Sequence, residues 1–128
     1  MKFYLGIDIG SIAAKVVVLN DAQEVIEEYY RRTAGEPIKT IKPLLEELNL
    51  RHKFSGIATT GSGGKLIVGE FVNEVIAQAE GISFFYPEIK TVIEMGGEDS
   101  KLLIMADGKL IDFATNSACV LFPDPGGP

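Results

Sequence analysis

The sequence predicts an α/β fold in which one complete lobe is followed by the first three strands of a second, similar lobe. Strand-like and helix-like segments follow one another in the order β-β-β-α-β-α-β-β-β. Hydrophobic residues make up 46% of the 128 residues, which is enough to build a packed core. An apolar strand followed by a glycine turn also occurs twice, as Ile7-Asp8-Ile9-Gly10-Ser11 and as Ile93-Glu94-Met95-Gly96-Gly97.

The first lobe, residues 1–89, is expected to begin with three strands, at Phe3–Ile9, Ala13–Leu19 and Glu24–Arg32. A helix then starts near Pro37, because proline is tolerated in a first turn. Its apolar residues recur at helical spacing, and Pro43 among them predicts a kink or a later start.

The remaining elements are a short strand, a second helix and a hairpin. The strand is predicted at Ser55–Thr60, and the helix at Glu70–Ala79 with Gly81 as its stop. In the second lobe, residues 90–119, strands are expected at Thr91–Met95, Lys101–Ala106 and Leu110–Ala114, with an Asp-Gly turn between the last two. The proline- and glycine-rich residues 120–128 predict an irregular tail.

Charge and composition exclude several classes of function. The net charge of −6 argues against a nucleic-acid partner, which needs a basic surface. No apolar run approaches the roughly 20 residues of a membrane helix, and the N-terminus does not read as a signal peptide. The single cysteine, Cys119, rules out an internal disulfide and favours a reducing compartment, so we expect a cytoplasmic protein.

His52, between Arg51 and Lys53, is predicted to be a solvent-facing loop residue.

The first loop, Asp8-Ile9-Gly10-Ser11, has the composition of a phosphate site. Gly10 lets the backbone approach a phosphate, and the amides around Gly10 and Ser11 can face its oxygens. Asp8 is predicted to hold Mg²⁺ through water. Lys15, seven residues after Asp8, could place its ammonium on the same phosphates. An ordinary hairpin with a Gly-Ser tip remains the alternative.

Two more glycine-rich loops have similar surroundings. Glu94-Met95-Gly96-Gly97-Glu98-Asp99-Ser100-Lys101 combines two glycines with three acids, which suits a metal-phosphate site, although a plain glycine hairpin is the alternative. Thr59-Thr60-Gly61-Ser62-Gly63-Gly64 taken alone reads as a flexible connection. All three loops follow apolar strands. In a duplicated two-lobe fold such strand ends converge on a cleft, so the three loops together favour nucleotide binding.

These segments, in this order, resemble a known family. The motifs are Gly6 to Lys15, Thr60-Gly61-Ser62-Gly63, Gly69-Glu70 with Asn73 to Ala77, Ile93 to Lys101, and Asn116 with Cys119. They are similar to the activators of 2-hydroxyacyl-CoA dehydratases in the BadF/BadG/BcrA/BcrD ATPase family. The first loop also resembles the first phosphate loop of actin. The resemblance covers Met1 to about Cys119.

The resemblance implies a ribonuclease H-like, actin-type ATPase fold. It implies a homodimer that binds ATP or ADP and shares one 4Fe-4S cluster, with two cysteines from each subunit. ATP hydrolysis would drive an electron into a dehydratase or a benzoyl-CoA reductase. It gives Asp8 and Glu94 catalytic roles, and assigns Cys119 as a cluster ligand. Nucleotide-binding residues would be Gly10, Ser11, Lys15, Gly61, Gly63, Gly96, Gly97, Asp99 and Lys101.

The sequence departs from the family after Cys119. Val120-Leu121-Phe122-Pro123 stands where the family has an Ala-Gly-Thr-Gly stretch, and a second ligand cysteine and an adenosine-binding motif are missing from these residues. We therefore expect an N-terminal fragment that is inactive by itself.

Two alternatives remain. One is a sugar kinase of the same fold, similar to N-acetylglucosamine kinase. It needs an aspartate as general base, and no aspartate occurs between Asp21 and Asp99. The other is a non-enzymatic, actin-like assembly module that binds nucleotide, in which Cys119 would be an ordinary core residue.

Overall fold

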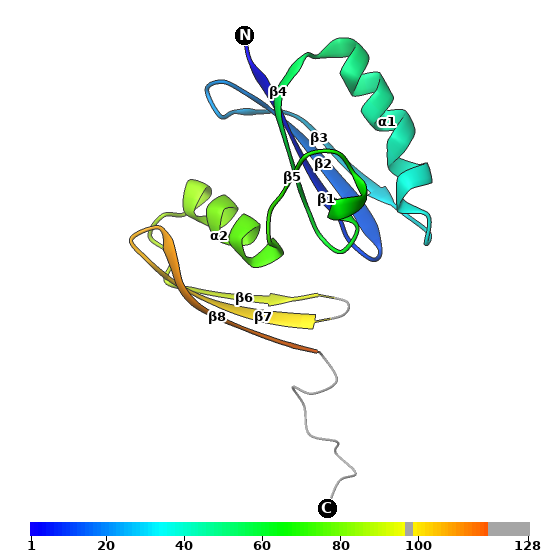
Figure 1. Ribbon diagram of the computed structural model, residues 1–128. Coiled ribbons are helices and arrows are strands. Elements are labelled where there is room, and N and C mark those ends of the chain that lie inside the picture. Colours follow the sequence, from blue (N-terminus) through cyan, green and yellow to red (C-terminus); the bar gives the residue numbers. More distant parts are fainter. Residues whose placement is uncertain (97–98, 118–128) are drawn as a thin grey trace, which may run out of the picture. The chain divides into compact units, whose positions relative to one another are not determined.

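The computed structural model describes residues 1–96 and 99–117, and its contacts divide the chain into two compact units (Figure 1). The first unit comprises Met1–Asn73 and the second begins at Glu74. The predicted α/β class is confirmed. The second helix groups with the second sheet, whereas the sequence analysis placed it in a first lobe of residues 1–89.

A five-stranded sheet forms the centre of the first unit, in the order β3-β2-β1-β4-β5. Strands β1 (Phe3–Ile9), β2 (Ala13–Asn20) and β3 (Val25–Arg32) form an antiparallel meander. Strand β4 (Phe54–Thr60) runs parallel to β1 on its other side, and the short β5 (Glu70–Phe71) runs parallel to β4. The carboxyl ends of β1 and β4 therefore lie at the same edge of the sheet.

Helix α1 (Pro37–Arg51) connects β3 to β4 and covers one face of this sheet (Figure 1). It starts at Pro37, as predicted, and passes through Pro43 without a later start. Pro43 is exposed, so the carbonyl group that loses its helical partner can be hydrated. The apolar stripe of α1 packs on alternate residues of β1 and β2, and the buried core consists of Leu5, Ile7, Ile9, Ala14, Val16, Val18, Ile41, Leu44 and Leu48.

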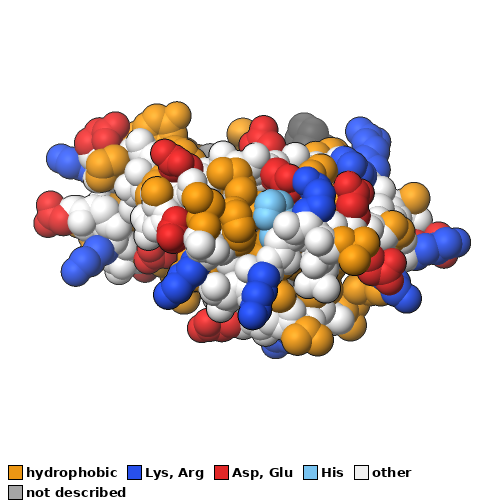
Figure 2. Space-filling view, turned by 90° about the horizontal axis from the view of Figure 1, so that it is seen from above, with side chains coloured by type: hydrophobic (Ala, Val, Ile, Leu, Met, Phe, Trp, Pro, Cys, Tyr) orange, Lys and Arg blue, Asp and Glu red, His pale blue; other side chains and the backbone are white. Residues whose placement is uncertain are grey.

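His52 lies in the loop after α1, as predicted, but the prediction that its side chain faces solvent was wrong. Only 14% of its side chain is exposed, and its ring centroid lies 4.6 Å from that of Phe3 and 5.8 Å from that of Phe54. Its Nε2 atom is 3.4 Å from Glu27 Oε2. The chain's single histidine, pale blue in Figure 2, reaches the surface between apolar and charged side chains. The flanking charges in the sequence concealed that the end of α1 tucks this ring against β1 and β4.

The prediction of a helix from Glu70 to a stop at Gly81 was also wrong at both ends. Residues Glu70–Phe71 form β5, after a short 3-10 helix at Gly64–Leu66 (η1), and helix α2 runs from Glu74 to Phe85. Gly81 lies within α2, in open space. The helix ends two residues before Pro87, which cannot continue it.

The second unit is a three-stranded antiparallel sheet with α2 packed on one face. Its strands are β6 (Thr91–Met95), β7 (Asp99–Ala106) and β8 (Lys109–Ser117), and the predicted hairpin turn lies between β7 and β8. Four buried residues form its core: Val75, Ala79, Leu103 and Met105. No helix in the described residues is long and apolar enough to span a membrane.

Candidate functional site

The first candidate loop is the tight turn between β1 and β2. The Gly10 amide donates a hydrogen bond to the Ala13 carbonyl group (2.9 Å), which closes the turn and sets Asp8 opposite Lys15. The Lys15 Nζ atom lies 3.5 Å from Asp8 Oδ2. The Lys15 ammonium group therefore lies beside the carboxylate of Asp8. Because the Gly10 amide donates inside the turn, it is not free to donate to a ligand.

The loop after β4 lies directly against the first loop. The Gly63 amide donates to the Ile9 carbonyl group (3.0 Å), and Ser62 Oγ lies 3.5 Å from the same oxygen. A Cβ atom on Gly61 would be 2.3 Å from the Ile9 oxygen and 2.5 Å from Asp8 Oδ1, and Gly61 has φ +86°. On Gly63 it would be 2.3 Å from Ile9 Cγ2. Glycine is required at both positions, because a side chain on Gly61 would overlap the Ile9 backbone and one on Gly63 would overlap the buried Ile9 side chain.

The two oxygens of Asp8 have different environments. Oδ2 faces Lys15, whose side chain is 56% exposed and can swing toward a ligand. Oδ1 is buried and has no hydrogen-bond partner. A buried, unpaired carboxylate oxygen costs free energy unless a ligand, ion or water satisfies it. The edge of the sheet at Asp8 therefore has the character of a small polar binding site.

The second candidate loop repeats the first. The Gly96 amide donates to the Asp99 carbonyl group (2.8 Å), and Glu94 stands opposite Lys101 in the β6–β7 pair. As in the first loop, the acid precedes the lysine by seven residues, and the glycine two residues after the acid closes the turn. The internal repeat seen in the sequence therefore extends to the hydrogen bond that shapes each hairpin.

Lys101 differs from Lys15 in its burial. Only 5% of its side chain is exposed, and its Nζ atom lies 2.9 Å from Asp99 Oδ1, 3.3 Å from Glu94 Oε2 and 3.9 Å from Glu74 Oε2. Burial by itself lowers the pKa of Lys101, but hydrogen bonds to Asp99 and Glu94 and the charge of Glu74 outweigh it and raise the pKa. The ammonium group therefore stays charged and holds the acids in place.

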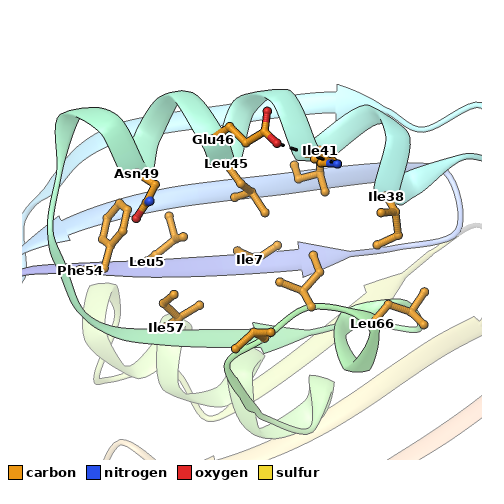
Figure 3. Close-up of a pocket in the computed structure, with 13 residues that line it drawn as sticks. Leu5, Ile7, Ile38, Ile41, Leu45, Glu46, Asn49, Phe54, Ile57 and Leu66 are labelled. Atoms are coloured by element: carbon orange, nitrogen blue, oxygen red, sulfur yellow. Dashed lines mark ion pairs between the residues drawn. The ribbon is translucent and has the colours of Figure 1, made fainter.

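Other predicted site residues lie elsewhere or outside the described residues. Gly97 and Cys119 are among the residues that the structure does not describe. Within the described ranges, no three carboxylate, thiol or imidazole groups gather so as to hold a metal ion by themselves. A groove of about 380 Å³ between α1, β1 and β4 is lined mainly by apolar side chains, including Leu5, Ile41 and Leu66 (Figure 3). None of the predicted site residues lines it.

Sequence analysis missed two side chains at these sites. Thr60 lies beside Asp8 in the parallel β1–β4 pair, and its Oγ1 atom is buried without a partner. Glu74 reaches Lys101 from α2. Both residues lie within the motifs quoted above, but the sequence gives neither of them a role, because each contact depends on how distant elements pair or pack.

Comparison with known proteins places the chain among ATPases. The model of the BadF/BadG/BcrA/BcrD ATPase family matches residues 5–120. The (R)-2-hydroxyglutaryl-CoA dehydratase activating ATPase of Acidaminococcus fermentans is 31% identical, over 93% of this chain and 49% of that protein. The 2-hydroxyisocaproyl-CoA dehydratase activator of Clostridioides difficile is 29% identical, over 91% of this chain and 47% of that protein. The chain thus spans about half the length of these relatives.

Solved structures give the same relationship. The C. difficile activator with bound ADPNP matches with a TM-score of 0.75 and 28% identity, over 91% of this chain and 46% of that one. Component A of the A. fermentans (R)-2-hydroxyglutaryl-CoA dehydratase matches with a TM-score of 0.76 and 30% identity, over 92% and 48%. An Aquifex aeolicus Ppx/GppA phosphatase, at 13% identity and a TM-score of 0.57 over 91% of this chain and 52% of that one, shares the fold alone.

Replacing Gly61 with alanine should destabilise the protein by about 2–4 kcal/mol. The new methyl group would overlap the Ile9 oxygen and Asp8 Oδ1, and it would strain a left-handed backbone. Gly81→Ala is the control, since its Cβ meets open space in a helix and should be neutral or stabilising by up to about 1 kcal/mol. Denaturant unfolding of both variants measures this. A neutral Gly61→Ala would show that the loops do not touch.

Replacing Lys101 with methionine should destabilise the second unit by about 1–3 kcal/mol at pH 7, because three carboxylates would lose their shared cation. Folding raises the pKa of Lys101, so its contribution is complete below the usual lysine value of 10.5 and is lost as the pH rises through the raised value. Unfolding of wild type and variant, compared at pH 7 and pH 11, should show the difference shrinking. A difference that grows with pH would contradict this charge assignment.

Proposed function

Since the chain belongs to the BadF/BadG/BcrA/BcrD ATPase family, we propose that it supplies the phosphate-binding loops of an ATP-hydrolysing activator for a 2-hydroxyacyl-CoA dehydratase or related reductase. The observation that carries this proposal is the Asp8–Lys15 pair at the turn against which Gly61 and Gly63 pack. This arrangement places a carboxylate, an exposed ammonium group and two closely packed backbone loops at one edge of the sheet.

In the first loop, each residue has a distinct role in the proposal. Lys15 turns its exposed ammonium from Asp8 Oδ2 to the phosphates of ATP. Ser11 supplies donors at the tip of the turn, and Gly10 keeps that tip open. Gly61 and Gly63 hold the loop after β4 against β1, so that Asp8 keeps its position when a ligand enters.

Mg²⁺ fits the first loop. Asp8 Oδ2 lies beside the exposed Lys15 ammonium group, which can turn away from it, and magnesium is often held by one carboxylate together with waters and substrate phosphates. Asp8 would hold the ion, which supplies neutralisation of phosphate charge when bound. Asp8 is thus proposed both as the metal ligand and as a catalytic residue.

The second loop is proposed to make phosphate contacts of its own. Glu94 is the second catalytic carboxylate, and Gly96 and Gly97 allow a phosphate to approach the backbone. Lys101 already holds Glu94 and Asp99, so a phosphate could reach its ammonium only by displacing one of them. Lys101 therefore acts first by fixing the direction of these acids.

The partner and redox roles depend on the longer proteins that this chain resembles. A 4Fe-4S cluster would supply the electron that passes to the dehydratase. Four cysteines usually hold such a cluster, and these 128 residues contain only Cys119. The residues present therefore do not make a cluster site by themselves. Cys119 is proposed as one ligand from each subunit of a homodimer, which accounts for two of the four cysteines.

Asp8→Asn should weaken binding of Mg-ATP to the complete gene product at least tenfold, because the amide cannot hold the metal. Asp21→Asn, at the exposed turn after β2, is the matched control and should bind like wild type. Isothermal titration with ATP, with and without Mg²⁺, measures both. Equal affinity of wild type and Asp8→Asn for Mg-ATP would contradict the metal assignment, and absence of ATP binding by wild type would refute the proposed function.

Cys119→Ser should remove most of the iron and acid-labile sulfide from the complete protein purified without oxygen, because serine is a poor cluster ligand. Iron analysis and the visible absorption spectrum, normalised to protein, measure the loss. A wild-type anaerobic preparation without iron would refute the redox part of the proposal and favour an assembly module.

A further inference from the structure

A polar row crosses three strands at the edge where the first loop lies. Lys15 of β2 stands opposite Asp8 of β1, and Asp8 stands beside Thr60 of β4. Side chains at one level of neighbouring strands share a face of the sheet. Residues on either side of Asp8, Ile7 and Ile9, are buried in the core, so the row lies on the face away from α1.

The Thr60 end of this row carries two unsatisfied atoms. Asp8 Oδ1 and Thr60 Oγ1 are both buried without hydrogen-bond partners. Their chemistry is complementary, because an ionised carboxylate only accepts a hydrogen bond whereas a hydroxyl group can donate one. Asp8 Oδ2, by contrast, is already beside the Lys15 ammonium. One half of the carboxylate therefore faces a cation, and the other half faces the side of the row where the hydroxyl group lies.

Gly61 adds a constraint on the same oxygen. A Cβ atom on Gly61 would lie 2.5 Å from Asp8 Oδ1, so the Cα hydrogen that takes its place points at this oxygen. This contact covers Oδ1 and leaves little room for a bulky partner. A hydroxyl group that rotates in place needs no extra room.

We propose that Thr60 is a positioning residue of the nucleotide site. Its hydroxyl group donates a hydrogen bond to Asp8 Oδ1 when Mg-nucleotide binds, and so holds Oδ2 toward the metal and its waters. This inference rests on the proposed function, since Asp8 must be the metal-holding residue. It gives a role to a motif residue for which the sequence predicted none. Charge-assisted hydrogen bonds of this type are short and strong, so the carboxylate would lose its freedom to rotate.

The test compares Thr60→Val, which keeps the shape and removes the hydroxyl group, with Thr60→Ser, which keeps it. Thr59→Val is the matched control, because Thr59 is the adjacent residue on the opposite face, is 1% exposed and also has an unpartnered Oγ1. Titrations of the complete gene product with ATP are carried out with and without Mg²⁺, and thermal unfolding of each variant is recorded.

Thr60→Val should weaken Mg-ATP binding about tenfold and leave binding of metal-free ATP unchanged. Thr60→Ser should restore the affinity, and Thr59→Val should behave like wild type. Equal losses with and without Mg²⁺, or no loss, would overturn the inference, as would failure of serine to rescue. If Mg²⁺ no longer increases the ATP affinity of Asp8→Asn but still increases that of Thr60→Val as in wild type, only this inference fails. If wild type binds no ATP, the proposed function fails and this inference with it.

Discussion

One main-chain hydrogen bond shapes each of the two candidate loops. In both hairpins, the amide of the glycine two residues after the acid donates to the carbonyl group three residues farther on, from Gly10 to Ala13 and from Gly96 to Asp99. That bond fixes the turn length, and the turn length fixes the register of the antiparallel pair. The acid and the lysine seven residues apart are placed opposite each other as a consequence. A side chain at Gly10 would press on the Ala13 oxygen at 3.2 Å, so glycine and the closed turn belong together.

The two hairpins have the same backbone turn, but their lysines lie in different electrostatic environments. Lys15 is mostly exposed and contacts one carboxylate, so it can exchange that contact for a phosphate at little cost. Lys101 is buried among three carboxylates and cannot leave without exposing unpaired negative charge. The difference arises from α2, which brings Glu74 and covers the β6–β7 face. The first loop is therefore suited to changing partners, and the second to holding a fixed arrangement of acids.

Local sequence patterns predicted the features that depend on local chemistry. The strand–turn–strand units and the start of α1 at Pro37 follow from short-range patterns. Features that depend on tertiary contacts were missed. Phe71 lay within the helix predicted at Glu70–Ala79 but joins the edge of the sheet. His52 packs against Phe3 and Phe54 although it lies between two charged residues in the sequence. Thr60 is in the same category, because only the parallel pairing of β1 with β4 places it beside Asp8.

The parallel pairing of β1 with β4 depends on α1, to which no candidate site residue belongs. A strand can return parallel to β1 only through a crossover, and α1 is that crossover. Leu48 and Ile41 are almost fully buried against the sheet, so the apolar face of α1 sets where β4 begins and which of its faces meets the core. A slip of one residue would turn Thr60 toward α1 and bring Thr59 to the face of Asp8. It would also move Gly61 and Gly63 away from Ile9, where no other residue fits. The register is thus constrained twice, by helix packing on one face and by backbone contact at the sheet edge. This double constraint holds Asp8 and the loop after β4 in fixed positions, which is what the proposed binding of a metal-bound phosphate would require.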